Sequence, residues 1–454
     1  MRDLTQGPIT GHLLSMAAFI GIGLVVQTLY FLIDLWFVAR LGADAVAGVN
    51  SAGNVFFLAM TASQLIAVGA MALIAQATGR KDQTDADLVS HQALSFGIVI
   101  GVGTLVAGYA LAPTVARLIG ADAATAQAGT AYLYGYLPAL ALMFPTIALT
   151  TALRATGVVQ PTMYVQTGSL LINAILAPVL ISGMGTGIAL GPFGAGLASS
   201  IASLLSMIAL VVMFGRVQKF LRIDFRRLRP NFSVWRRITD IGLPSALEFL
   251  IMFLTNIIIY VVIRDFGSHA QAGFGIGARI MQAIFLPAMA VAFAAAPIAG
   301  QNFGAKSFDR VRLTFRQAAL IGSAIMAALT LLCQLAPDFM LAPFASDAVT
   351  LGVAIGYLKV VSWNFVAIGI NFACGGMFQA LGDTRPSLIA SASRIVTFAV
   401  PAIWLAQSAD LRLEHIWWLS LVSATTQALI SFVLMRRMFV RKLGPTLAHA
   451  TGTT

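Results

Sequence analysis

The sequence predicts an all-α membrane protein with twelve transmembrane helices, arranged as two six-helix lobes related by a parallel internal repeat. Three observations predict this fold class. First, the 454 residues are 59% hydrophobic and only 10% charged, with a mean hydropathy of +0.88, whereas a soluble protein carries about 25% charged residues. Second, apolar stretches long enough to cross a bilayer recur along the whole chain. Third, short groups of residues recur at one constant offset between the two halves.

The expected spans alternate with short polar or glycine-containing turns. They cover residues 12–40, 46–75, 91–117, 125–153, 160–182, 189–215, 238–264, 269–300, 313–336, 347–380, 386–407 and 414–436. No cleavable signal peptide is expected, because Arg2 and Asp3 lead into a full-length span. Both cysteines, Cys333 and Cys374, fall in apolar spans, where thiols pack against neighbours and no disulfide framework is indicated.

The distribution of basic residues predicts the orientation in the membrane. With a cytoplasmic N-terminus, 21 of the 28 lysines and arginines lie in cytoplasmic segments and 4 lie at outer ends. Cytoplasmic loops carry such an excess of positive charge. We therefore expect both termini to be cytoplasmic in a multi-pass protein of a cell membrane, with the bacterial inner membrane favoured. The net charge of +11 indicates this topology and not nucleic-acid binding.

The domain organisation follows from one long polar connection. Residues 215–237 contain eight basic residues and are expected to lie at the interface with anionic lipid. We expect an N-terminal six-span lobe over residues 1–215, a basic cytoplasmic linker over residues 216–237 and a C-terminal six-span lobe over residues 238–454.

The two lobes carry matching residues 225 positions apart. Gly42 matches Gly267, Lys81 matches Lys306 and Gly157 matches Gly382 at this offset. Since each copy has six spans, both copies have the same orientation, which is a parallel repeat about an axis along the membrane normal. Such paired lobes enclose a cleft and give alternating access by rocking, an arrangement that favours a secondary transporter.

The first span contains the residue on which the functional prediction depends, Asp34. It lies on one helical face with Gln27 and Tyr30, at positions i, i+3 and i+7. A carboxylate inside a membrane is costly and marks a functional site. We expect no lysine or arginine within the spans of the first lobe, so desolvation favours the neutral acid. Asp34 is thus a candidate proton-coupling residue; the alternative is a hydrogen-bonded neutral acid without that role.

The second lobe has the opposite charge balance. Glu248, Arg279, Lys359 and Arg394 lie on four different spans, and each is expected in the central third of the membrane. We expect Glu248 to form a structural ion pair with one of these cations, and Arg279 and Arg394 to face the lobe interior. Several polar or charged side chains inside spans are candidates for lining a substrate cavity. They are Asn54, Gln64, Glu248, Asn256, Arg279, Lys359 and Asn364.

Three segments resemble those of the multidrug and toxic compound extrusion (MATE) family. They are the first-span string at residues 31–42 (FLIDLWFVARLG) and the turns at residues 300–305 (GQNFGA) and 382–386 (GDTRP). With the twelve spans and the repeat, the resemblance covers essentially the whole chain. It implies an exporter of cationic, amphipathic compounds driven by inward H⁺ or Na⁺.

The resemblance also implies roles for particular residues. Asp34 matches the family's first-span acid, and Asn173 matches a fifth-span asparagine that faces it in some members. Those members carry a second acid one turn later, where this chain has Ala177. The tenth span has only Asp347 at its outer edge, whereas sodium-driven members use acids on the seventh and tenth spans. The pattern is therefore closer to the proton-driven, DinF-like branch.

We thus predict a secondary active multidrug exporter, a cation-coupled antiporter with H⁺ favoured. No catalytic residue, metal site or cofactor is expected. The expected partners are small organic cations and membrane lipid, without nucleic acid, and the chain is expected to be a monomer. Two alternatives stay open: a Na⁺-coupled drug exporter, and a flippase of related fold for lipids or lipid-linked oligosaccharides. An intramembrane enzyme is disfavoured, because no HExxH, GxSxG or paired aspartates on neighbouring spans are present.

Overall fold

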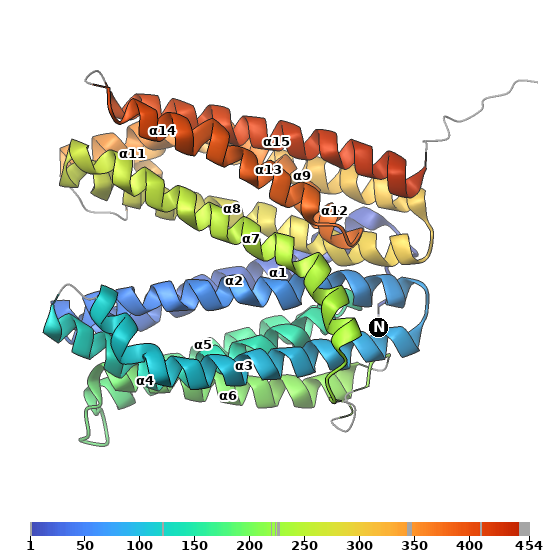
Figure 1. The fold of residues 1–454 in the computed structure, drawn as a ribbon, viewed down its shortest axis with the longest axis horizontal. Coiled ribbons are helices and arrows are strands. Elements are labelled where there is room, and N and C mark those ends of the chain that lie inside the picture. The colour runs from blue at the N-terminus through green and yellow to red at the C-terminus, as the bar shows by residue number, and fades with distance from the viewer. Residues whose placement is uncertain are drawn as a thin grey trace, which may run out of the picture. The chain divides into compact units, whose positions relative to one another are not determined.

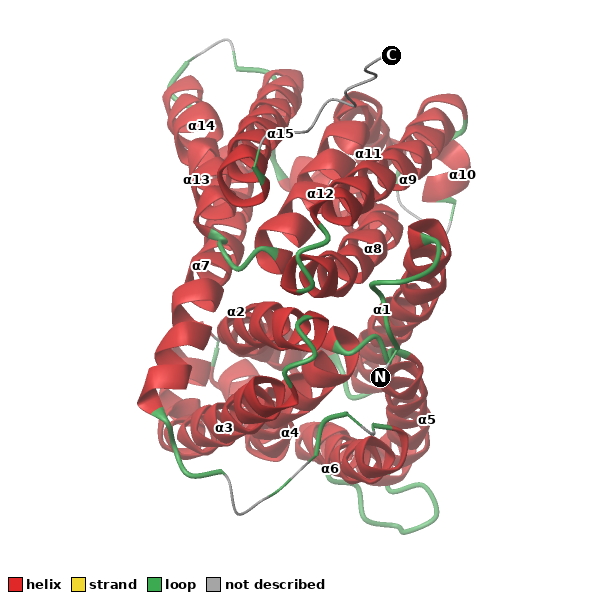
Figure 2. Cartoon of the chain, turned by 90° about the vertical axis from the view of Figure 1, so that its right-hand side faces the viewer, coloured by secondary structure: helices red, strands yellow, loops and turns green. Residues whose placement is uncertain are grey.

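The computed structural model describes residues 2–119, 122–218, 220–222, 224, 228–342, 347–408 and 411–444. Three linker cations counted above, Lys219, Arg226 and Arg227, lie outside these residues. Figure 2 shows helices joined by loops, and the described residues contain no strand.

Twelve helices in the described ranges are long and apolar enough to cross a membrane, as predicted. Two of these spans are interrupted by short non-α segments. The helical elements are α1 (Ile9–Ala39), α2 (Ala43–Gly79), α3 (Gln83–Ile119), α4 (Ala123–Ala155), α5 (Gln160–Ser182), α6 (Gly191–Val217), α7 (Phe232–Ile263), η2 (Arg264–Phe266), α8 (Ser268–Gly304), α9 (Phe308–Leu335), α10 (Pro337–Leu341), α11 (Ala348–Val361), η3 (Ser362–Asn364), α12 (Phe365–Ala380), α13 (Arg385–Arg394), η4 (Ile395–Ala399), α14 (Val400–Leu405) and α15 (Leu413–Leu443).

The chain divides into two compact units, and Figure 1 shows the long helices within each unit lying alongside one another. Unit 1 contains Met1–Gln6 and Ala18–Ala246, and unit 2 contains Gly7–Ala17 and Leu247–Thr454. One boundary falls between Gln6 and Gly7, just before α1, and the others fall inside α1 and α7, whereas the sequence predicted the division in the linker. The first half of α7 belongs to unit 1, beyond the expected lobe end at residue 215.

The internal repeat is visible in the helix bounds. The 225-residue offset relates α2 (Ala43–Gly79) to α8 (Ser268–Gly304), and it relates the first residues of α3, α4 and α5 to those of α9, α11 and α13. It also relates Lys81 to Lys306, which both have a left-handed backbone with φ 59°. Non-glycine residues seldom adopt this conformation, so each lobe has the same strained turn after its second span.

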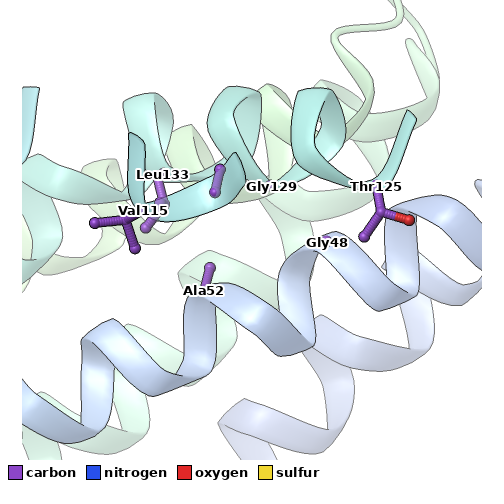
Figure 3. Close-up of a pocket in the computed structure, with 7 residues that line it drawn as sticks. Gly48, Ala52, Val115, Thr125, Gly129 and Leu133 are labelled. Carbon is purple, nitrogen blue, oxygen red and sulfur yellow. The ribbon is translucent and has the colours of Figure 1, made fainter. Parts of the chain in front are cut away.

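A close helix crossing is also repeated. A Cβ atom on Gly48 of α2 would lie 2.9 Å from the Thr125 carbonyl oxygen of α4, and one on Gly273 of α8 would lie 2.7 Å from the Thr350 carbonyl oxygen of α11. Figure 3 shows Gly48 and Ala52 facing α4 across a small cavity. Small residues let membrane helices approach this closely.

The fourth span of each lobe opens at its middle. In α4 the Ser200 hydroxyl of α6 donates to the Gly135 carbonyl (2.6 Å) and accepts the Ala139 N–H (3.1 Å), next to Pro138. At the repeat-equivalent place in unit 2, the 3₁₀ segment η3 separates α11 from α12, and Thr330 of α9 donates to the Ser362 carbonyl (2.9 Å). A hydroxyl from a neighbouring helix thus satisfies backbone groups that the helix leaves open.

The basic linker is held against the beginning of α3. Asp87 accepts the Arg222 N–H (3.0 Å) and His91 Nε2 accepts the Asp224 N–H (2.8 Å). Gln92 accepts the Asn231 N–H (2.8 Å) and Ser95 donates to the Leu228 carbonyl (2.6 Å). These bonds satisfy the polar backbone of a segment that has no regular structure, and they place the first half of α7 in unit 1.

Candidate functional site

The first site is built around Asp34 in unit 1. The side chain is 7% exposed and lies five residues before the end of α1. The Tyr132 hydroxyl of α4 donates to Asp34 Oδ2 at 3.4 Å. Tyr132 and Tyr136 are one helical turn apart and stack with ring centroids 5.2 Å apart. Asp34 therefore faces the aromatic side of α4 and not the lipid.

Two further helices complete this site. Asn173 of α5 is fully buried, lies beside Asp34 and donates to the Ser199 hydroxyl of α6 at 3.2 Å. Tyr30, one turn before Asp34, is half-buried next to Asn173 and Ser199. Asp34 Oδ1 and Asn173 Oδ1 are both buried without a hydrogen-bond donor. Four helices thus supply neutral polar groups around one carboxyl.

No cation lies against this carboxyl within the residues the structure describes. The neighbours of Asp34 are the hydroxyl of Tyr132 and the amide of Asn173. The nearest arginine along α1, Arg40, instead stacks over the Trp36 ring, 3.8 Å from its centroid. A buried carboxylate with only neutral partners gains stability by binding a proton.

The structure brings Asp34, Tyr30 and Asn173 together, but it leaves Gln27 exposed on α1, outside the cluster. Tyr132 and Ser199 were not predicted from the sequence. Tyr132 could have been found from its spacing, because Tyr132 and Tyr136 occupy one face of the fourth span. Ser199 has no comparable signal, since its position depends on how α6 packs.

The ion pair expected for Glu248 is wrong for the described residues. The hydroxyls of Ser387 and Ser391 on α13 donate to Glu248 Oε2 (2.6 Å) and Oε1 (2.9 Å), and no cation contacts the carboxyl. Glu248 bonds to the first two turns of α13. It therefore lies closer to the N-terminal end of α13 than to the middle of the membrane, where it was expected.

The three intramembrane cations of unit 2 occupy different environments. Arg279 and Lys359 are exposed on α8 and α11, so the expectation that Arg279 faces the lobe interior is wrong. Arg394 is half-buried at the end of α13, with its Nε atom enclosed and Tyr357 as its electrostatic neighbour. The π-helical turn η4 (Ile395–Ala399) follows it directly.

The remaining cavity candidates also differ in exposure. Asn54 and Asn256 are exposed and Gln64 is half-buried. Asn364 is buried inside unit 2, where it accepts the Thr425 hydroxyl at 3.0 Å and donates to the Ser420 carbonyl at 3.4 Å. Asn364 therefore joins η3 to α15 and does not line an open surface. A common cavity for the others stays a prediction.

Comparison with known proteins places this architecture among membrane transporters. The MatE family model matches residues 20–179 and 244–405. The chain therefore belongs to the MATE family, whose members are transporters and not enzymes.

Several individual proteins are similar over nearly their full length. The probable multidrug resistance protein YoeA of Bacillus subtilis is 27% identical over 398 residues, covering 87% of this chain and 86% of that protein. The multidrug export protein MepA of Staphylococcus aureus is 24% identical over 422 residues, covering 91% and 90%. A MOP superfamily transporter from Pyrococcus furiosus has the same fold, with a TM-score of 0.89, 22% identity and 98% coverage of both chains.

Proposed function

We propose that this protein is a proton-coupled antiporter that exports organic cationic, amphipathic compounds by alternating access. The observation that carries the proposal is the buried Asp34 carboxyl with neutral partners only. The names of YoeA and MepA describe multidrug resistance and export, which supports the substrate class. The first-span acid and the lack of a deep tenth-span carboxyl support the proton-driven, DinF-like branch.

The geometry supports proton exchange at Asp34 in a specific way. Asp34 Oδ1 and Asn173 Oδ1 are both buried acceptors that lack a donor. The ionised acid leaves Asp34 Oδ1 unsatisfied at a cost of about 1–3 kcal/mol, whereas the protonated acid replaces one buried acceptor with a donor. Loss of the proton therefore favours rearrangement of α1 against α5, which couples proton release to a change of shape.

The orientation proposed from the basic residues determines the side of the membrane from which Asp34 takes up its proton. With both termini cytoplasmic, α1 ends at the outer face of the membrane, so Asp34 exchanges protons with the outside. We further propose that the chain acts as a monomer in the bacterial inner membrane, with no cofactor besides the coupling ion.

The decisive experiment uses proteoliposomes with ethidium as the transported cation. An imposed pH gradient should drive ethidium transport by the native protein, and an imposed Na⁺ gradient should not. Asp34→Asn should lose the proton-driven transport while the protein stays folded. Asp122→Asn, at an exposed helix cap where asparagine also caps, is the matched control. Native-like transport by Asp34→Asn contradicts the proposed coupling.

A flippase for anionic lipids or lipid-linked oligosaccharides is the second candidate. Arg279 and Lys359 favour it, because both are exposed in membrane spans and neither has a carboxylate partner among the described residues. Lipid-flipping assays on Arg279→Gln and Lys359→Gln decide between the candidates. A flippase needs these cations for activity, whereas an exporter of organic cations keeps ethidium transport without them.

A further inference from the structure

A second carboxyl within the membrane spans, half-buried in unit 2, has hydrogen-bond donors that the proposed mechanism does not use. Glu248 of α7 accepts hydrogen bonds from Ser387 and Ser391 of α13. Gln427 of α15 donates through Nε2 to the Ser391 hydroxyl at 2.9 Å. Three helices therefore meet at this carboxyl, and its partners are hydroxyls backed by an amide.

The hydrogen-bond directions distinguish the two carboxyl oxygens. Because Gln427 Nε2 can only donate, the Ser391 hydroxyl must direct its own hydrogen toward Glu248 Oε1. Ser387 lies 2.6 Å from Oε2 and has no such constraint, so this bond can run in either direction. An ionised Glu248 accepts from Ser387, and a protonated Glu248 donates to Ser387 from Oε2. The site therefore accommodates both the ionised and the protonated form of Glu248 without a change in the backbone.

No charged group on the packed helices fixes the state of Glu248 within the described residues. On α13, Arg394 has Tyr357 as its neighbour. On α15, Arg441 pairs with Asp383 at 2.6 Å and Lys442 donates to the Leu381 carbonyl. On α7 itself, Asp240 pairs with Arg236 at 3.9 Å. Arg385, two residues before Ser387 on α13, is exposed, and the groups that act on Glu248 are the Ser387 and Ser391 hydroxyls, so its described surroundings are neutral.

The internal repeat shows that packing does not require a carboxyl here. The residues equivalent to Glu248, Ser387 and Ser391 in unit 1 are Gly23, Thr162 and Gln166. A Cβ on Gly23 would lie 2.4 Å from Gln166 Oε1, so the Gln166 amide occupies the place of the Glu248 side chain. Unit 1 thus builds the same helix contact with a neutral amide.

Glu248 lies at the point where α7 passes from unit 1 into unit 2. Glu248 is the second residue of α7 that belongs to unit 2, since the boundary between units falls after Ala246. Its bonds to α13 attach α7 to unit 2 at the point where the helix enters that unit. Ser387 is the third residue of α13, and in the proposed orientation α13 starts at the cytoplasmic face.

We propose that Glu248 is a second proton-exchange site of this transporter, open to the cytoplasm through Ser387, as Asp34 is open to the outside in unit 1. The proposal rests on the proposed proton-coupled function. In the release step the Glu248 Oε2–H bond breaks and the proton passes to water at the cytoplasmic end of α13. The electron pair stays on Oε2, which then accepts the Ser387 hydroxyl.

The test measures pH-gradient-driven ethidium transport in proteoliposomes and ethidium binding by the purified protein. Glu248→Gln should lower the driven transport by about tenfold, equal to ~1.4 kcal/mol of barrier, and the binding measurement separates this loss from a loss of ethidium affinity. The glutamine keeps an acceptor for Ser391 and reproduces the amide chemistry of unit 1, so this variant should fold. Glu248→Asp, which keeps a carboxyl, should retain part of the driven transport.

A pH profile distinguishes proton exchange from a structural role. Ser387→Ala removes one donor from the anionic carboxylate, and hydrogen bonds to charged groups contribute about 1.5–3 kcal/mol. Ser387 also bonds the protonated acid, but that bond is the weaker of the two, so the pH of half-maximal transport should move upward. Thr162→Ala is the matched control at the equivalent place of unit 1, where the hydroxyl donates to the Val159 carbonyl of its own chain segment. Its profile should not move.

The outcomes separate this inference from the proposed function. If the native protein ignores a pH gradient, or a Na⁺ gradient replaces it, the proton-coupled function fails and this inference fails with it. If the native protein responds and Asp34→Asn does not, but Glu248→Gln transports with a native rate and pH profile, only the role of Glu248 is overturned.

Discussion

At the scale of single residues, the buried carboxyl of Asp34 and the half-buried carboxyl of Glu248 are held by different neutral partners. Asp34 has a tyrosine hydroxyl and an asparagine, and Glu248 has two serine hydroxyls. Asp34 could be predicted because a carboxylate in an apolar stretch is visible in the sequence. Its partner Tyr132 and the serines around Glu248 could not, since they depend on helix rotation and on which helices pack together.

Tyr132→Phe tests whether the Tyr132 hydroxyl influences proton binding by Asp34. The change removes the Tyr132 hydroxyl that donates to Asp34 Oδ2 and keeps the ring stacked against Tyr136. Because this donor favours the anionic acid, transport should become half-maximal at a higher pH, while ethidium binding stays the same. Tyr134→Phe, whose ring stacks on Tyr109 away from Asp34, is the control. An unchanged profile in Tyr132→Phe contradicts the role of this hydroxyl.

At the scale of helices and turns, the repeat was predictable because glycines and lysines at turns recur at one offset. The interruptions η3 and η4 were not predicted. The sequence around residues 362–364 contains no proline, and the 3₁₀ turn there is supported by Thr330 of another helix. The local sequence cannot predict an interruption of a helix that depends on a side chain from a distant segment.

The caps of the fourth span in each lobe give a prediction about stability and pH. Asp347 accepts the Thr350 N–H and hydroxyl, at 2.9 and 2.8 Å, and these bonds lower its pKa to about 2, with the Thr350 N–H as the largest cause. A carboxyl with a lowered pKa stabilises the fold above its unfolded pKa of about 4 and loses that contribution as pH falls toward about 2. Thermal unfolding in detergent should show Asp347→Ala less stable than native at pH 6, with the difference vanishing near pH 2.

Asp347→Asn is the control for this cap, because asparagine also accepts the N–H bond. Its unfolding temperature should lie near the native value at pH 6 and depend less on acid. The equivalent Asp122, which caps α4 by accepting the Thr125 N–H at 2.7 Å, should behave like Asp347. A constant difference between Asp347→Ala and the native protein from pH 6 to pH 2 contradicts this account.

The close crossing of α8 and α11 gives a second stability prediction. Gly273→Ala places a Cβ 2.7 Å from the Thr350 carbonyl oxygen, which is backbone and cannot turn aside. The protein should lose about 1–3 kcal/mol of stability, measured by unfolding in detergent. Gly352→Ala is the control, because a Cβ on Gly352 of α11 meets nothing within 4 Å. Equal stability of the two variants argues against a tight crossing.

At the scale of the whole molecule, composition predicted the class and the number of spans, because a bilayer requires apolar helices of a minimum length. The division into units was predicted less well. The boundary inside α7 follows from hydrogen bonds between the linker and α3, which link residues more than 130 positions apart. The charge of the linker identifies it as a connection, but it does not show what holds it.

The proposed topology can be measured by labelling with a membrane-impermeant thiol reagent in intact cells. Gln83→Cys, at the first residue of α3, should be protected, and Thr186→Cys, between α5 and α6, should react. Both positions are exposed, and the two native cysteines, Cys333 and Cys374, are buried and free, so background labelling should be low. Permeabilised cells serve as the control, in which both variants should react. The reverse pattern in intact cells contradicts cytoplasmic termini.

The division of α7 between the units has a consequence for motion. The chain passes between the units at three places: between Gln6 and Gly7 before α1, inside α1, and inside α7. Pro244 lies two residues before the crossing point in α7 and removes one rung from the backbone ladder there. A movement of one unit relative to the other therefore bends α1 and α7, and Pro244 determines where α7 bends most easily.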